Sequence, residues 1–532
     1  MSRQSFLHGA MILAAAGLIS KVLGILYRIP FARLVGAEGM GLYQMAYPIY
    51  TMVLALATAG FPVAISVLVS EKEARGDLLG MRRVFWLALL ILSSLGLLMS
   101  WVLYHLAGFL AEQVLHDTRA LYSLMVISPA IFFAATMSVF RGFFQGQQLM
   151  LPTALSQIVE QVIRVATVLL GAWWLLPRGP EYAAAGATFG AVTGGAAGLL
   201  VLLIIFIGFQ PVKPKSTLAT EQLSEGLFSL LKRLLVLAFP IALGALVMPL
   251  VQTLDAFLVP LRLQDAGYTT QEATELFGQL SGMAGTLINL PGVITIALAT
   301  SLVPAISSAM ARQQMEVVYQ RFNTAIRVVG IVTLPAAVGF YILAVPISDL
   351  LYGLPEAGWP LQALAPAVFF LGLYQATSAS LQGMGRTGLP VRHLLLAAGF
   401  KVILNYLLVV NPAFGIQGAG IATGAAFALA AGLNIVSLRQ LVGYSPPWRA
   451  LLLKPALAVT IMAVLVAQLN QGLQPVVPNQ GLLTLTIILA GALVYGLGIL
   501  ILGGIEQREI EMIPGIGPQL ADWLRYFKLV RG

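Results

Sequence analysis

Residues 145–164 read QGQQLMLPTALSQIVEQVIR, and residues 382–401 read QGMGRTGLPVRHLLLAAGFK. Three features recur at matching places, namely a Gln-Gly pair, an early proline and a final cation: Gln145-Gly146, Pro152 and Arg164 in one stretch, Gln382-Gly383, Pro390 and Lys401 in the other. Each stretch begins where one apolar segment ends and finishes inside the next. The chain therefore repeats a helix-loop-helix unit. A cation inside an apolar helix is costly, so we expect each one to serve a purpose.

The composition shows whether this repeat lies in water or in a lipid bilayer. Of the 532 residues, 59% are hydrophobic and 10% are charged, and the mean hydropathy is +0.89. Such a chain cannot coat a soluble globule, so it is predicted to be an all-α integral membrane protein. A span takes about 20 apolar residues. We predict 14 transmembrane helices, which start near residues 9, 42, 84, 121, 152, 183, 234, 276, 328, 361, 390, 415, 451 and 482.

The repeat extends into the next helix of each copy. Gly186-Ala187-Thr188-Phe189-Gly190 follows Arg164, and Gly420-Ile421-Ala422-Thr423-Gly424 follows Lys401, both small enough for close packing. The copies cover spans 4–6 and 10–12, and an even offset makes them parallel. We predict two pseudo-symmetric six-helix lobes and two extra C-terminal helices, with these boundaries: N-terminal lobe 1–208, cytoplasmic linker 209–232, C-terminal lobe 233–443, spans 13 and 14 in 444–505, and an amphipathic tail 506–532.

Charge and cysteine content narrow the function. Most of the 30 Lys and Arg residues lie in loops of one side, which predicts a multi-pass cytoplasmic-membrane protein with both termini in the cytoplasm. Loop cations facing anionic lipid explain the net charge of +9 without nucleic acid. No cysteine and four scattered histidines give no metal site. Because no connection is large enough for a soluble domain, we expect neither an enzyme nor catalytic residues. Residues 9–27 should remain as span 1.

Three stretches carry a family resemblance: Ser20-Lys21-Val22-Leu23-Gly24 with Arg28 and Ala32-Arg33, Arg141-Gly142-Phe143-Phe144-Gln145-Gly146, and residues 291–307. They resemble the multidrug/oligosaccharidyl-lipid/polysaccharide (MOP) exporter superfamily. The branch is that of stage V sporulation protein B and polysaccharide biosynthesis proteins, similar to MurJ-type lipid II flippases. The resemblance spans the whole chain. It implies transport of an undecaprenyl-pyrophosphate-linked saccharide from the inner to the outer leaflet.

Pyrophosphate cannot cross hydrocarbon unaided, so a cavity must supply cations for it. Lys21, Arg28 and Arg33, on span 1 and at its exit, are the candidates. Lys21 and Arg28 are spaced to share a helix face two turns apart. The alternative is that Arg28 and Arg33 snorkel to the outer interface. Arg164 has Glu160 four residues earlier, a spacing that favours an ion pair, so it either packs the lobe or lines the cavity once the glutamate releases it.

The resemblance also implies an ion or gating site. In some lipid II flippases a span 7 carboxylate and polar residues of spans 11 and 12 bind sodium, and Asp255, Asn405 and Thr423 match approximately. Lys401 stands one turn before Asn405, where a neutral or acidic ligand would be expected. We therefore predict a Lys401–Asp255 charge pair in place of the ion. Span 8 offers Asn289 where those flippases carry an arginine, so Asn289 joins the predicted pyrophosphate site.

The sequence predicts a flippase for lipid II-like precursors of peptidoglycan or spore cortex, working by alternating access. The alternatives are a flippase for exopolysaccharide or O-antigen-type oligosaccharides, a multidrug or cation antiporter, and a non-transporting membrane scaffold. We expect no cofactor, and coupling to membrane potential, H⁺ or Na⁺ stays open. The expected partners are the lipid-linked saccharide, membrane lipids and cell-wall synthesis enzymes, with the chain as a monomer and no nucleic acid.

Overall fold

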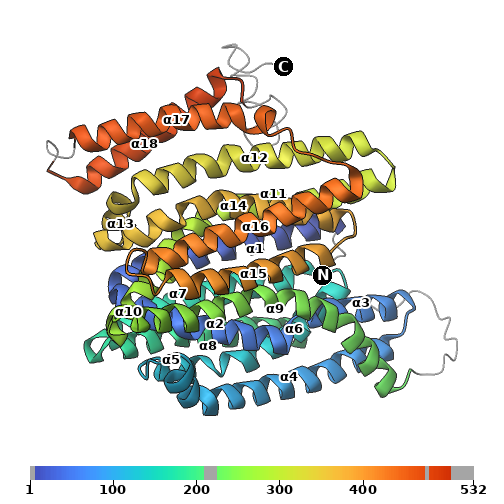
Figure 1. The fold of residues 1–532 in the computed structure, drawn as a ribbon. Helices are drawn as coiled ribbons and strands as arrows, with labels where there is room; N and C mark the ends of the chain where they lie inside the picture. The colour runs from blue at the N-terminus through green and yellow to red at the C-terminus, as the bar shows by residue number, and fades with distance from the viewer. Residues whose placement is uncertain (1–5, 209–224, 474–477, 505–532) are drawn as a thin grey trace. The chain divides into compact units, whose positions relative to one another are not determined.

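The computed structural model describes residues 6–208, 225–473 and 478–504. These residues form helices and no strand (Figure 1). Thirteen of their helical stretches are long and apolar enough to cross a membrane. The first stretch, Met11–Ala74, contains both of the first two predicted spans, because the chain only turns at Tyr27 and kinks at Gly36 (φ 70°) before continuing as helix. The prediction of an all-helical membrane protein is confirmed, and the predicted count of 14 agrees once this stretch is divided.

The helices group into two compact units, Met1–Gly282 and Met283–Gly532. The first unit contains α1 (Phe6–Leu26), α2 (Arg28–Thr58), α3 (Phe61–Ala74), α4 (Leu78–Phe109), α5 (Ala120–Ile127), α6 (Ala130–Gly146), α7 (Met150–Leu175), α8 (Pro180–Ile207), α9 (Leu227–Asp265) and α10 (Thr270–Phe277). The second contains α11 (Gly285–Ala311), α12 (Met315–Ile342), α13 (Ala344–Tyr352), α14 (Gly358–Gly383), α15 (Gly388–Leu408), α16 (Ile416–Val442), α17 (Trp448–Leu473) and α18 (Gln480–Ile501).

Packing assigns α9 to the first unit. Its residues Leu230, Leu234 and Ala238 are buried in the same core as Phe85 and Phe140 of α4 and α6. The close approach of aromatic rings in this core, with Phe85 and Phe140 centroids 5.2 Å apart, adds stability beyond the area buried. The lobe boundaries predicted above follow the sequence duplication and not the packing of the helices. They place span 7 at the start of the second lobe, and they stay a prediction. In the described structure, the first helix after the linker packs with the helices before it.

The repeat is visible in the helix boundaries. α6 and α14 end at Gly146 and Gly383, the glycines of the two Gln-Gly pairs. α7 and α15 begin a few residues later, and each carries its proline as the third helical residue, Pro152 and Pro390. Proline fits there because amides of the first turn have no partner within the helix. The predicted helix-loop-helix unit is therefore present twice.

The glycines of the next helix pack differently in the two copies. A Cβ added at Gly190 of α8 would lie 2.9 Å from the carbonyl oxygen of Arg164 in α7. A Cβ added at Gly420 of α16 would instead lie 2.8 Å from Cβ of Ala363, which belongs to α14. Small residues allow close approach in both copies, as predicted. In the first copy the motif glycine therefore faces the residue that carries the repeated cation, whereas in the second copy it is Gly418, before the motif, that meets the backbone of α15 at Leu408.

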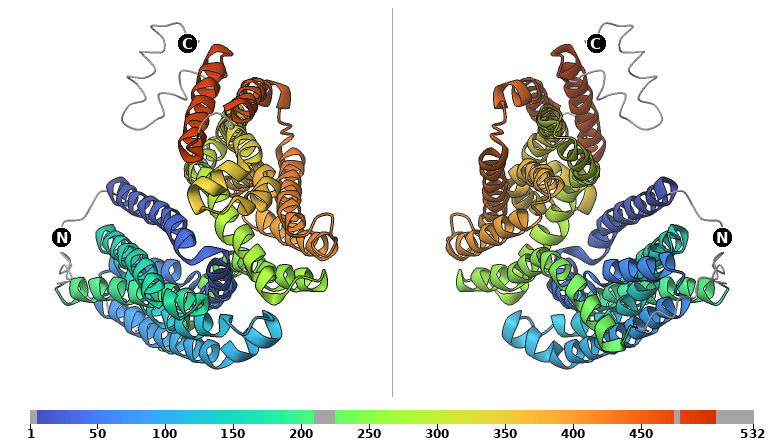
Figure 2. Two further views of the ribbon diagram at one scale, coloured as in Figure 1. Left: turned by 90° about the vertical axis from the view of Figure 1, so that its left-hand side faces the viewer. Right: turned by 90° about the vertical axis from the view of Figure 1, so that its right-hand side faces the viewer.

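The two extra C-terminal helices, α17 and α18, pack against each other and both contact α12 in the second unit (Figures 1 and 2). The α18 residue Tyr495 donates its hydroxyl to the Ile331 carbonyl of α12 at 2.7 Å. The predicted amphipathic tail, 506–532, lies outside the described residues, as does most of the predicted linker.

Candidate functional site: a cationic pocket in the first unit

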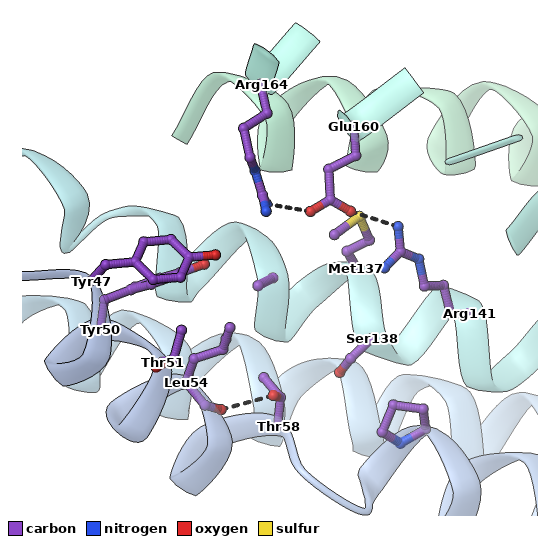
Figure 3. A pocket seen from close by; sticks show the side chains of 12 residues that line it. Tyr47, Tyr50, Thr51, Leu54, Thr58, Met137, Ser138, Arg141, Glu160 and Arg164 are labelled. Atoms are coloured by element: carbon purple, nitrogen blue, oxygen red, sulfur yellow. Dashed lines mark hydrogen bonds and ion pairs between the residues drawn. The ribbon is translucent and has the colours of Figure 1, made fainter. Parts of the chain in front are cut away.

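A pocket of about 280 Å³ lies among α2, α3, α6 and α7 of the first unit (Figure 3). Its walls combine hydroxyl groups, apolar side chains and three charged groups. The lining residues are Tyr47, Tyr50, Thr51, Leu54, Thr58, Pro62, Ala134, Met137, Ser138, Arg141, Glu160 and Arg164. Most charged residues of a membrane protein lie outside its apolar helices, so three together in one pocket indicate a functional site.

The three charged side chains are joined through Glu160. Its Oε1 accepts a hydrogen bond from Arg164 Nη2 at 2.5 Å, and its Oε2 accepts one from Arg141 Nη2 at 2.8 Å. Arg141 is fixed further, since its Nε donates to Ser156 Oγ at 3.0 Å. The side chains are largely shielded, with exposed fractions of 17% for each arginine and 15% for the glutamate. The ion pair predicted within α7 is confirmed, and a second arginine from α6 completes it.

Glycines of α8 place α7 at this pocket. A Cβ added at Gly194 would lie 2.7 Å from the Glu160 carbonyl oxygen and 3.0 Å from Arg164 Cβ. No side chain fits in that space, so α8 lies directly against the turn of α7 that carries both charges. On the opposite side of α7 the apolar side chain of Val162 is exposed. The sequence therefore fixes which face of α7 is polar and which is apolar.

Tyrosines of α2 form the wall opposite the charged triad. Tyr47 stacks on Tyr43 with ring centroids 5.4 Å apart, and Tyr50 lies 5.8 Å from Tyr47. Figure 3 shows Tyr47 and Tyr50 together on the same side of the pocket. The guanidinium carbon of Arg28 lies 6.0 Å from the Tyr47 ring centroid, at the outer limit of a cation–π contact. Of the predicted site residues, Arg164 thus lines the pocket, and Arg28 lies next to Tyr47 in its wall.

Two guanidinium nitrogens, one in the pocket and one beside its tyrosine wall, are unsatisfied within the part of the chain that the structure describes. The Nε atoms of Arg28 and Arg164 are buried and lack a hydrogen-bond acceptor among the described residues. Leaving a buried charged donor unsatisfied costs stability, and a ligand oxygen would remove that cost. Guanidinium groups bind carboxylates and phosphates through parallel N–H donors. The pocket is therefore suited to an anion with several oxygens.

The other predicted pyrophosphate ligands, Lys21, Arg33 and Asn289, are not among the residues that line this pocket. Lys21 and Arg33 are exposed, and Lys21 lies in α1 whereas Arg28 is the first residue of α2. Tyr27 between them keeps helical dihedral angles, and its N–H donates to the Leu23 carbonyl at 3.2 Å, so the shared face of Lys21 and Arg28 stays a prediction. Asn289, in α11 of the second unit, donates its amide to the Gly285 carbonyl at 2.7 Å.

The predicted ion or gating residues belong to both units. Asp255 is in α9, whereas Lys401 and Asn405 are in α15 and Thr423 is in α16. Lys401 and Asn405 are buried, with exposed fractions of 8% and 1%. The Thr423 hydroxyl donates to the Ala419 carbonyl at 2.8 Å, a bond within its own helix. The proposed Lys401–Asp255 pair stays a prediction.

Sequence reasoning missed Arg141, Tyr47 and Tyr50. Arg141 enters the sequence argument only as part of a family motif, and its place near the end of an apolar segment gives no sign of a site residue. One signal was available: Glu160, an acid in an apolar helix, needs cationic partners. The second partner could not be identified from spacing, because Arg141 is on a different helix.

Among the described residues, helices long and apolar enough to span a membrane enclose a polar pocket, an arrangement typical of multi-pass membrane transporters. The family model for "Polysaccharide biosynthesis protein" matches residues 6–310, and the MatE model matches residues 281–407. The chain belongs to the polysaccharide biosynthesis protein family of the MOP superfamily. The family predicted from the sequence motifs is thereby confirmed.

Two curated relatives come from Bacillus subtilis (strain 168). Stage V sporulation protein B is 33% identical over 522 residues, which cover 97% of this chain and 99% of the relative. Lipid II flippase MurJ is 28% identical over 483 residues, covering 86% and 87%. A solved structure of lipid II flippase MurJ in an inward closed conformation has a TM-score of 0.67 at 19% identity, covering 92% of this chain and 98% of that one. That structure supports the fold alone.

Proposed function

We propose that the protein is a flippase that carries an undecaprenyl-pyrophosphate-linked saccharide across the cytoplasmic membrane by alternating access. Its cargo would be a lipid II-like precursor of peptidoglycan or spore cortex. Two named relatives support this choice, one a lipid II flippase and one a sporulation protein. Both termini would lie in the cytoplasm, as the distribution of basic residues predicts.

The observation that carries the proposal is the unsatisfied guanidinium chemistry of the pocket. In the pocket, Arg164 holds a buried Nε without an acceptor among the described residues, and Arg141 adds a second guanidinium against the single carboxylate of Glu160. Arg28, beside Tyr47 but not among the lining residues, carries a second such Nε. A diphosphate offers several charged oxygens to such groups, and charge-assisted bonds to phosphate are about twice as strong as neutral ones. Threonine, serine and tyrosine hydroxyl groups in the same walls could bind sugar hydroxyl groups.

The pocket argues against the cation antiporter. Such a transporter would place acidic groups around its cargo, whereas here arginines outnumber the one glutamate. The MatE model matches residues 281–407, nearly all of which belong to the second unit and none of which lines this pocket, so the charge of the pocket does not bear on that match. A flippase for another lipid-linked glycan would use the same pocket chemistry, and a scaffold would not need the pocket.

Leaflet exchange in proteoliposomes tests the proposal. The full chain is reconstituted, and exchange of labelled lipid II, another labelled undecaprenyl-linked glycan and a cationic dye is followed in parallel. We expect exchange of lipid II. Exchange of the other glycan alone would move the assignment to that cargo, and exchange of the dye alone would refute the flippase. Repeating the assay with an imposed membrane potential, pH gradient or Na⁺ gradient identifies the coupling, which the sequence left open.

A further inference from the structure

The carboxylate of Glu160 occupies the place where an anionic ligand would bind. Each of its oxygens accepts a hydrogen bond from a different arginine, at 2.5 Å from Arg164 and 2.8 Å from Arg141 (Figure 3). Two oxygens of one phosphate group could receive the same two donors. The free protein thus resembles an anion site whose ligand is supplied by its own chain.

Electrostatics explains why the free pocket needs such a group. Two arginines buried among apolar helices without a counter-charge would be strongly destabilising. One carboxylate reduces that cost but does not remove it, since one positive charge and the Arg164 Nε remain uncompensated. A diphosphate carries more charge and more acceptor oxygens than a carboxylate does. It can therefore replace Glu160 at a guanidinium, whereas a simple monoanion gains little by doing so.

The two arginines are not equally free to change partners. Arg141 also donates through Nε to Ser156, whose hydroxyl in turn donates to the Thr153 carbonyl at 2.8 Å. Arg164 holds Glu160 through Nη2, while its Nε has no acceptor among the described residues. Arg164 is thus the guanidinium that can turn toward a ligand, and Arg141 is the one that keeps Glu160 in place.

We propose that Glu160 is an internal counter-anion. It forms an ion pair with Arg164 in the unliganded pocket, the pair breaks when Arg164 binds the diphosphate of the cargo, and the pair forms again when the cargo leaves. This rests on the proposed function, because it assigns a role within the cargo site. Glu160 lowers affinity for the anion and, by reclaiming Arg164, speeds its release. It is a positioning residue, since it acts on the cargo through the arginine.

Glu160→Gln tests this directly, because glutamine keeps the shape of the side chain and loses its charge. Binding of inorganic pyrophosphate to the solubilised full-length protein is measured by calorimetry, beside leaflet exchange of lipid II. We expect pyrophosphate to bind about tenfold more tightly to E160Q than to the wild type, since the competing charge-assisted bond is lost. Lipid II exchange should show a lower KM together with a lower kcat, because release slows.

A matched control removes a carboxylate away from the pocket. Glu356, in the short exposed turn before α14, is suitable, and E356Q should leave pyrophosphate binding unchanged. If E160Q does not fold, Glu160→Asp keeps the charge but shortens the reach to Arg164, and it should bind pyrophosphate more tightly than the wild type by a smaller factor.

The outcomes separate the two proposals. Tighter pyrophosphate binding in E160Q without any lipid II exchange by the wild type would support the internal counter-anion and refute the proposed cargo. Unchanged or weaker pyrophosphate binding in a folded E160Q or E160D would overturn the inference and leave Glu160 as a packing ion pair.

Discussion

Replacing Gly194 of α8 with alanine should displace the turn of α7 that carries Glu160 and Arg164, and so disturb the pocket. The added Cβ would lie 2.7 Å from the Glu160 carbonyl oxygen and 3.0 Å from Arg164 Cβ, so α7 and α8 must move apart. Overpacking of this kind costs about 1–3 kcal/mol of folding free energy. Alanine also stabilises a helix by about 0.5–1 kcal/mol relative to glycine, which offsets part of that cost. The expected net destabilisation is therefore about 0–2.5 kcal/mol.

Gly432→Ala is the matched control, because Gly432 is exposed in α16 and a Cβ there meets nothing within 4 Å. It gains the same helix propensity without the clash. The difference between the two variants should be about 1–3 kcal/mol in unfolding of the solubilised protein, measured in one detergent. Pyrophosphate binding should weaken in G194A alone. Equal stabilisation of both variants would refute the reasoning that the α8 glycines position Glu160 and Arg164.

Three further predictions concern other parts of the molecule. Asn434→Leu should lower unfolding free energy by about 2–3 kcal/mol, because this fully buried amide bonds side chains of α14 and α15; unfolding of the solubilised variant measures it. Burial opposes ionisation of Glu225, but hydrogen bonds from neighbours including Lys72 hold the pKa of its carboxyl below its ordinary value. That stability is present above the unfolded pKa and is lost as pH falls through the folded pKa, so Glu225→Gln should flatten the acid limb of a melting curve. If Lys401 and Asp255 form a pair, the double alanine variant should exchange cargo better than either single variant; no improvement leaves the pair unsupported.

The duplicated stretch predicted local structure well because its signals act locally. A Gln-Gly pair ended a helix in both copies, at Gly146 and Gly383, and the proline fitted the first turn of the next helix in both. The pairing of Arg164 with Glu160 was also predictable, since four residues separate neighbours on one helix face.

The candidate site could be predicted only in part, because its remaining residues come from other helices. Arg141 meets Glu160 only once α6 and α7 pack together, and no spacing in the sequence encodes that contact. Tyr47 lies in the predicted span that starts near residue 42, where no motif marks it, yet with Tyr50 it lines the pocket that holds the arginines. The approach of Arg28 to the Tyr47 ring likewise depends on how α2 folds beyond the kink at Gly36, which no spacing between Lys21 and Arg28 encodes.

Exchange of labelled lipid II by Arg164→Gln tests the central claim most directly. The full-length variant is reconstituted beside Arg178→Gln, which removes an exposed arginine at the end of the same helical stretch. The account predicts that R178Q exchanges lipid II at the wild-type rate, while R164Q, equally folded, loses at least about tenfold in kcat/KM with the loss of a charge-assisted bond. Wild-type exchange by R164Q would contradict the claim that this pocket binds the diphosphate of the cargo.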